Sequence, residues 1–140
     1  MKYQERTYRN RVSKENLVSF QIKVGETDLY ISAEKDLTDI ARELVYKYRR
    51  FIEEYIKHRP QFLDSLVPIE ADEMAPAIIR DMLNASRVSG VGPMASVAGA
   101  IAQHVGLDLL DHSNDVIVEN GGDIFLKSES NVNIGIFAGE

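Results

Sequence analysis

Cysteine is absent from the 140-residue chain. Its absence excludes disulfides, thiol catalysis and zinc–thiolate sites. Long apolar runs are absent too, since none approaches the roughly 20 residues that a membrane-spanning helix needs. The first sixteen residues, "MKYQERTYRNRVSKEN", lack the apolar core of a signal peptide. We therefore expect a cytoplasmic protein without a membrane partner.

An excess of basic charge is also lacking. The chain has 16 Lys and Arg against 22 Asp and Glu, for a net charge of −6, which argues against a nucleic-acid partner. The hydrophobic fraction of 44% and charged fraction of 27% are typical of a globular protein. We expect one domain over residues 1–140. Because "NIGIFAGE" stops just after a strand pattern, we also expect an N-terminal portion of a longer chain.

Two strands joined by a tight turn are predicted in the first third. "LVSFQIKV" alternates apolar and polar residues with a period of two, and "TDLYIS" follows in register. Gly25 and Glu26 between them suit a type II′ turn, whose first position needs a positive φ. The earlier "KYQERTYRN" predicts a further edge strand.

A long amphipathic helix follows and should end before Pro60. Asp36 opens it, and we expect its carboxylate to accept a hydrogen bond from the amide of Asp39. The basic residues on its polar side are Lys47, Arg49 and Arg50. We interpret them as a solvated face, with an anion site as the alternative.

A proline-rich connector separates this helix from two more. The second begins near Pro76. Its predicted inner face consists of Ile78, Ile79, Met82, Leu83 and Ser86. The third should run from Pro93 to Gly106 and is rich in small residues. Gly99 costs about 1 kcal/mol relative to Ala in a helix interior, so we expect a close approach there as compensation.

The final third returns to strands, in "VIVENGGDIFLKS" and "NVNIGIF". The order of strands, long helix, two helices and strands predicts the α+β class. We expect a mainly antiparallel sheet packed with a long helix and two further helices.

Glycines before the third helix form a first candidate site. Gly90 and Gly92 precede Pro93 and Met94, where exposed amides and the helix dipole favour an anion such as phosphate. The spacing matches neither a dinucleotide fingerprint nor a P-loop. A purely structural loop is the alternative.

The tip Asn120–Asp123, Asn-Gly-Gly-Asp, forms a second candidate site. A plain hairpin needs Asn-Gly or Gly-Gly but not both plus Asp, so the tip has one surplus glycine. We therefore expect Gly121 and Gly122 to serve ligand approach as well as the turn. Asp123 could then accept from ligand hydroxyls or bind a cation. The alternative is a turn alone. The three histidines, His58, His104 and His112, lack metal-ligand spacing.

These motifs together suggest a family. "SGVGPMASVAGAIAQHVG", "VIVENGGDIFLKS" and "NVNIGIF" resemble the FAD-dependent protein FMN transferases, the ApbE-like superfamily formerly described as thiamine-biosynthesis lipoproteins. The whole chain, from "ERTYR" to "GIFAG", is similar to an uncharacterised, leaderless branch of that superfamily.

The resemblance implies an ApbE-like fold that binds FAD or FMN, and in a full-length form Mg²⁺, with a protein substrate for FMN. It places Gly90, Gly92, Pro93 and Met94 at the phosphate end of the ligand, and the Asn120–Asp123 tip along its adenosine or flavin side. The chain departs from the pattern at Ala95, where the transferases have Lys. The family's metal-binding residues would come from a later segment, so we expect this chain alone to be inactive.

Three hypotheses follow. The first is a flavin-nucleotide-binding protein related to the transferases. The second is another phosphate-ligand enzyme on the same scaffold. The third is a non-enzymatic interaction or oligomerisation module, such as a homo-oligomer.

Overall fold

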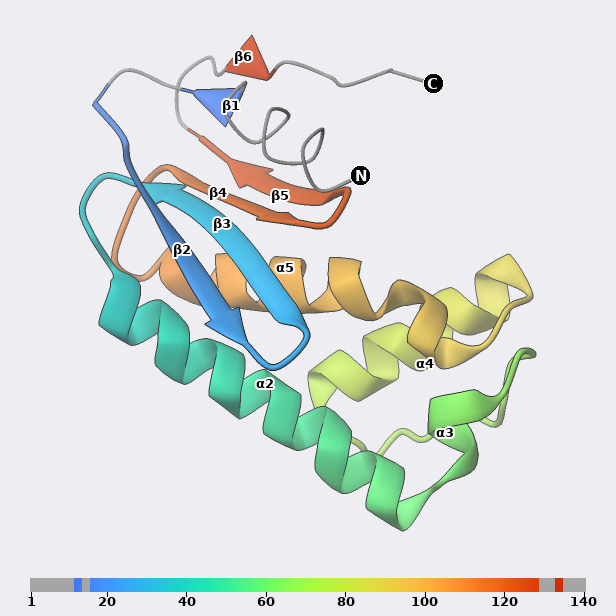
Figure 1. Ribbon diagram of the computed structural model, residues 1–140. Helices are drawn as coiled ribbons and strands as arrows, with labels where there is room; N and C mark the ends of the chain where they lie inside the picture. Colours follow the sequence, from blue (N-terminus) through green and yellow to red (C-terminus); the bar gives the residue numbers. More distant parts are fainter. Residues whose placement is uncertain (1–11, 14–15, 129–132, 135–140) are drawn as a thin grey trace.

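The computed structural model describes residues 12–13, 16–128 and 133–134. Four antiparallel strands form the main sheet in the order β2-β3-β4-β5, and helices α2 and α5 lie beside it (Figure 1). The class is α+β, as predicted, with an antiparallel sheet and one long helix. This architecture establishes the α+β class and not the ApbE-like fold in particular.

The two predicted hairpins are confirmed within the sheet. β2 (Val18–Val24) pairs with β3 (Thr27–Ala33), and Gly25 between them has a φ of 56°. β4 (Val116–Asn120) pairs with both β3 and β5 (Asp123–Lys127). The short strands β1 (Val12–Ser13) and β6 (Asn133–Ile134) pair with each other. The predicted edge strand "KYQERTYRN" and most of "NVNIGIF" lie outside the described residues.

The long helix α2 (Thr38–His58) ends before Pro60, as predicted. Its start differs in one detail, because Asp36 accepts from the amide of Thr38 at 2.9 Å and from the Thr38 hydroxyl. The amide of Thr38 thus takes the place that we expected for the amide of Asp39. A bond between the Asp side chain and the amide two residues later forms an Asx turn.

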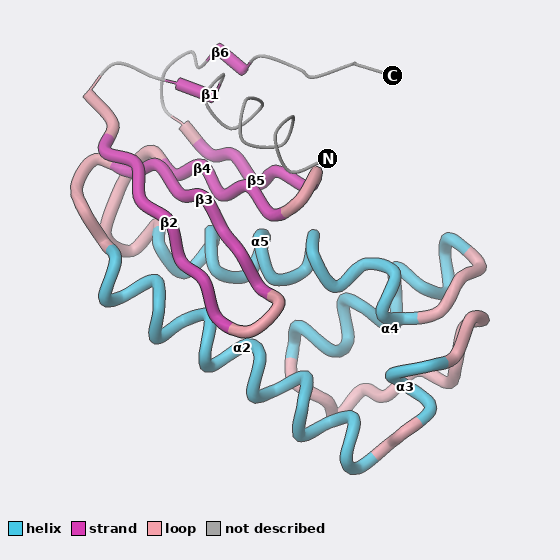
Figure 2. Tube along the Cα trace, viewed as in Figure 1, coloured by secondary structure: helices cyan, strands magenta, loops and turns pink. Residues whose placement is uncertain are grey.

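The connector contains only one short helix in its described residues, α3 (Gln61–Asp64). Figure 2 shows the rest of it as loop. α4 (Ala77–Ser89) follows, and its five buried residues are those predicted for its inner face. Gly90 ends α4 with a φ of 76°, a left-handed conformation that glycine adopts without steric cost.

The third predicted helix begins at Pro93 with a 3-10 turn, η1 (Pro93–Ser96), and continues as α5 (Val97–Leu109). Gly106 does not end this helix, contrary to the prediction. A Cβ built on Gly106 would lie 2.1 Å from Cδ2 of Phe125 on β5, so this glycine lets the helix pass beneath the ring. Its role is close packing, which the sequence pattern alone does not distinguish from helix termination.

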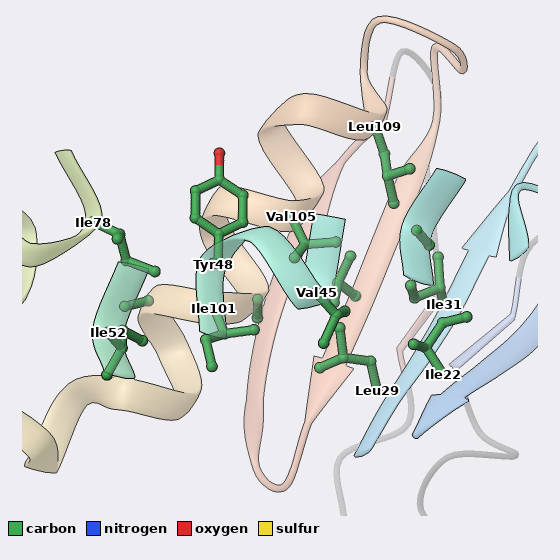
Figure 3. Close-up of a cluster of buried hydrophobic side chains, with 14 of the residues drawn as sticks. Ile22, Leu29, Ile31, Val45, Tyr48, Ile52, Ile78, Ile101, Val105 and Leu109 are labelled. Carbon is green, nitrogen blue, oxygen red and sulfur yellow. The ribbon is translucent and has the colours of Figure 1, made fainter. Parts of the chain in front are cut away.

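The core lies between the sheet and the helices. Leu29 and Ile31 of β3 face Val45 of α2, and Ile101 and Val105 of α5 complete the contact (Figure 3). α4 packs against α2 and α5 and adds Ile78. Burying each such side chain stabilises the fold by about 1.5–3 kcal/mol, so the cluster fixes both helices on one face.

The contact between Gly106 and Phe125 predicts that Gly106→Ala has opposite effects on stability with and without the Phe125 ring. Gly106→Ala should lower the free energy of unfolding by about 1–3 kcal/mol, because the new methyl group overpacks the ring. In a Phe125→Ala background the same change should raise it by up to about 1 kcal/mol, because alanine is the better helix former. Urea unfolding of the four proteins measures both effects. A Gly106→Ala change that stabilises both backgrounds equally would contradict the close packing.

Candidate functional site

A cavity of about 440 Å³ opens between α2, the start of α5 and the tips of both hairpins. We call it the hairpin cavity. Its lining is Glu26, Thr27, Arg49, Ile52, Glu53, Ile56, Leu63, Met94, Val97, Ala98, Ile101 and Asn120. Most of these side chains are apolar, and the polar ones belong to the hairpin tips and to one side of α2. A mainly apolar cavity with a few polar groups is the usual form of a small-ligand site.

Arg49 is the central polar group of the hairpin cavity. Its Nη1 donates to the Thr27 hydroxyl at 2.8 Å, and its Nη2 lies 3.1 Å from Glu26 and 3.3 Å from Glu53. The side chain is 20% exposed and lies against Gly25, where a Cβ would be 2.6 Å from Nη2. Arg49 therefore ties the β2–β3 turn to α2. The predicted solvated face does not hold at this position, because the hairpin covers the guanidinium.

The carboxylates beside Arg49 are exposed, 92% for Glu26 and 60% for Glu53. Hydrogen bonding to its own backbone amide, and then the bond and charge of Arg49, lower the pKa of Glu26. Glu26 therefore remains ionised at neutral pH, and the mouth of the cavity carries two carboxylates for one guanidinium.

Asn120 contributes the opposite wall from the β4–β5 tip. Its Nδ2 donates to the carbonyl oxygen of Ala98 in α5 at 3.1 Å, which leaves Oδ1 as the acceptor of that side chain. Asp123, three residues on, lies instead against Gly99, where a Cβ would be 3.3 Å from Oδ1 of Asp123. It lines a separate hollow with Gln103 and Phe125. The structure thus brings the tip onto α5 but places Met94 and Asp123 in different hollows.

The glycines of the predicted sites have different structural roles. Gly90 caps α4, and a Cβ on Gly92 would lie 1.7 Å from the carbonyl oxygen of Ser65, so Gly92 permits a close contact with the connector. Gly121 has a φ of 66°, as the first position of a type II′ turn requires. Gly122 has neither a positive φ nor an atom within 4 Å of a built Cβ. The surplus glycine of the tip is therefore Gly122, and its role in ligand approach stays a prediction.

Sequence reasoning named Arg49 only within an alternative anion site, together with Lys47 and Arg50, and it missed the β2–β3 turn as part of a site. The signal was present in the pairing of a basic residue on α2 with a glycine turn. That pairing indicates a contact only once the fold places α2 beside the hairpin.

A second hollow, of about 250 Å³, lies between α4 and the connector and has Asp72 and Asp81 in its lining. Both carboxylates already stabilise the fold. Asp72 accepts from the Tyr55 hydroxyl at 2.8 Å, which contributes most to lowering its pKa, and Asp81 lies 2.7 Å from Nε2 of the buried His104. We therefore regard the hairpin cavity as the candidate site.

A polar cluster joins the three longer helices beside this hollow. The His104 ring lies 5.4 Å from that of Tyr48, whose hydroxyl donates to Asp108 at 2.5 Å. Burial is the main cause that raises the pKa of Tyr48, and the bond to Asp108 adds to it. Tyr48 therefore remains a protonated donor that links α2 to α5.

A patch of exposed apolar side chains lies where α3 and the loop after α4 meet. We call it the apolar end; it consists of Leu63, Leu66, Val67, Val88 and Val91. The close contact of Gly92 with Ser65 and Leu66 holds the two segments side by side. Leu63 also lines the hairpin cavity, so the two features adjoin.

Two structural signatures are absent from residues 12–13, 16–128 and 133–134. No described helix is long and apolar enough to cross a membrane. Within the same ranges, no group of three His, Asp or Glu side chains is arranged to hold a metal ion.

Comparison with known proteins shows the family. A family model described as "AbpE bacteria" matches residues 9–140, and the chain belongs to that family. Similar relatives are UPF0280 proteins. That of Methanocaldococcus jannaschii is 40% identical over 120 residues, covering 85% of this chain and 48% of the relative. That of Methanococcus aeolicus is 36% identical over 125 residues, covering 88% and 50%. The UPF0280 protein of Archaeoglobus fulgidus is 37% identical over 120 residues, covering 84% and 51%.

These comparisons correct the resemblance drawn from the motifs. The family is that of the UPF0280 proteins, and neither the family description nor these relatives' names mention flavin, FMN transfer or magnesium. The assignment to the FAD-dependent FMN transferases is therefore wrong. The glycine-led helix and the Gly-Gly-Asp tip were a poor guide to the family, because Gly90, Gly92 and Gly121 have structural roles in this fold. The chain spans about half the length of the curated relatives it matches.

Arg49 generates the prediction for this site. Arg49→Gln should lower the free energy of unfolding by about 1–2 kcal/mol, mainly because the buried Thr27 hydroxyl loses its charged donor. The exposed partners Glu26 and Glu53 add little, since solvent screens them. The neighbouring Arg50 is exposed, so Arg50→Gln should change stability by less than about 0.5 kcal/mol. Equal effects of the two changes in urea unfolding would contradict the anchoring of the hairpin.

Proposed function

We propose that this chain binds a small molecule with an apolar body in the hairpin cavity. The observation that carries the proposal is the cavity itself, with a floor of Ile52, Val97 and Ile101 and polar groups gathered on its rim. Two residues of the sequence-predicted sites, Met94 and Asn120, line it. A volume of about 440 Å³ is in the range of small-ligand sites.

The phosphate reading of the glycine loop has less support. Gly90 and Gly92 serve the cap of α4 and a contact with the connector, and the amide of Ala95 donates to the carbonyl of Gly92 at 3.2 Å. Catalysis is not part of the proposal. A cytoplasmic location also stays a prediction, as does the single domain from 1 to 140; composition is the support for both.

Filling the cavity tests the proposal with indole as the probe. Ala98→Phe places a ring in the cavity, whereas Ala95→Phe puts the same ring at an exposed position outside the lining. Saturation-transfer NMR should detect indole on the wild type and on Ala95→Phe but not on Ala98→Phe. Urea unfolding checks that both variants fold. Unchanged indole binding by a folded Ala98→Phe variant would overturn the proposal.

A second candidate function, self-association, is favoured by the apolar end. Leu66 is 86% exposed and Val88 76%, and exposed apolar side chains gathered on neighbouring segments commonly mark an interface. The flanking charges differ in sign, with Asp64 beside Leu63 and Arg87 beside Val88. A two-fold arrangement would set each segment against the oppositely charged segment of a second copy. We therefore propose a second copy of this chain as the partner.

Sedimentation tests this second candidate. The wild type should form a dimer at high micromolar concentration, and the double change Leu66→Asp with Val88→Asp should leave a monomer, because burying the new carboxylates is costly. Met74→Asp is the control. Met74 is 94% exposed but precedes α4, about 20 Å from its far end. A monomeric wild type, or a dimer unaffected by the double change, would contradict the interface.

A further inference from the structure

The charged groups at the mouth of the hairpin cavity are Glu26, Arg49 and Glu53. Their formal charges sum to −1. Arg49 is engaged on both terminal nitrogens, with Thr27 at 2.8 Å on one and the two carboxylates at 3.1 and 3.3 Å on the other. The guanidinium of Arg49 is therefore already paired with two carboxylates. An anionic ligand would meet two carboxylates beside this guanidinium.

The two glutamates and Asn120 offer hydrogen-bond acceptors to a ligand at the rim. Each glutamate has a second carboxylate oxygen, and Asn120 has Oδ1 beside an Nδ2 group that spends one of its two N–H donors on the carbonyl of Ala98. Carboxylate and amide oxygens accept hydrogen bonds, so the complementary groups are donors. A charged donor would gain the attraction of the net negative mouth as well.

We propose that the hairpin cavity selects a cationic amine that carries an apolar or aromatic body. The apolar body occupies the floor beside Val97 and Ile101, and the ammonium group lies at the rim between Glu53, Glu26 and Asn120. The inference rests on the proposed function, because it concerns the ligand class of the same cavity. It separates this site from phosphate and carboxylate ligands, which the rim repels.

Three probes with one ring system test the charge preference. Tryptamine carries an ammonium group, indole-3-acetate a carboxylate, and indole no charge, so the apolar contribution is shared. At neutral pH and low salt, tryptamine should bind at least about threefold more tightly than indole-3-acetate, the size expected for exposed charges. The difference should shrink in high salt, since the mouth is solvent-exposed.

The carboxylates supply matched variants. Glu26→Gln combined with Glu53→Gln should abolish or reverse the preference, because it removes the negative charge and releases Arg49 for an anion. Glu54→Gln is the control, since Glu54 is exposed, pairs with Lys57 and lies outside the cavity lining. Titration by NMR gives the dissociation constants without requiring an activity.

The outcomes distinguish the two proposals. Equal affinity for tryptamine and indole-3-acetate, or a preference for the acid, would overturn the amine inference while leaving a ligand-binding cavity. The same holds if Glu54→Gln alters the preference as much as the double variant does. Failure of all three probes, or binding that a folded Ala98→Phe variant does not weaken, would overturn the proposed function and the inference with it.

Discussion

Close approach of α5 to the sheet is the constraint on which the rest of this structure depends. The helix passes beneath Phe125 because position 106 has no side chain, and it meets the β4–β5 tip at Gly99. That approach seals the apolar face of β3 and β4, burying Leu29, Val116 and Val118. With α5 in place, α2 covers the part of the same face that β2 and β3 form, and α4 packs on both helices. A bulkier α5 would separate these layers and remove the core they share.

The hairpin cavity follows from the same arrangement. The two turns overhang the start of α5, while α2 lies across from them, so apolar side chains line a space that none of them fills. Arg49 keeps the β2–β3 turn over α2 through Thr27, and Asn120 fixes the other turn to Ala98. Both anchors use side-chain hydrogen bonds between elements distant in sequence. The shape of the cavity is thus set by the bonds that also hold the hairpins in register with the helices.

The glycines show how one residue type serves unlike purposes within a single fold. Gly25, Gly90 and Gly121 adopt positive φ, whereas Gly92 and Gly106 allow backbone and ring contacts too close for any side chain. Read as motifs, several of them resembled those of the FMN transferases, and the comparisons overturned that family assignment. Turns, caps and close packing need glycine as much as phosphate binding does, so a glycine pattern alone does not identify a ligand.

The sequence by itself determined the four strands of the main sheet, the long helix and the inner face of α4, because hydrophobic periodicity reports which side of an element is buried. It also located both hairpin turns, since Gly25 and Gly121 mark positions where φ must be positive. The tertiary structure decided what periodicity does not encode: that Gly106 lies within α5, that Arg49 is covered by a hairpin, and that Met94 and Asp123 line separate hollows. These facts depend on distances between elements far apart along the chain. A one-dimensional pattern contains the faces of each element, but the contacts between those faces exist only once the layers are packed.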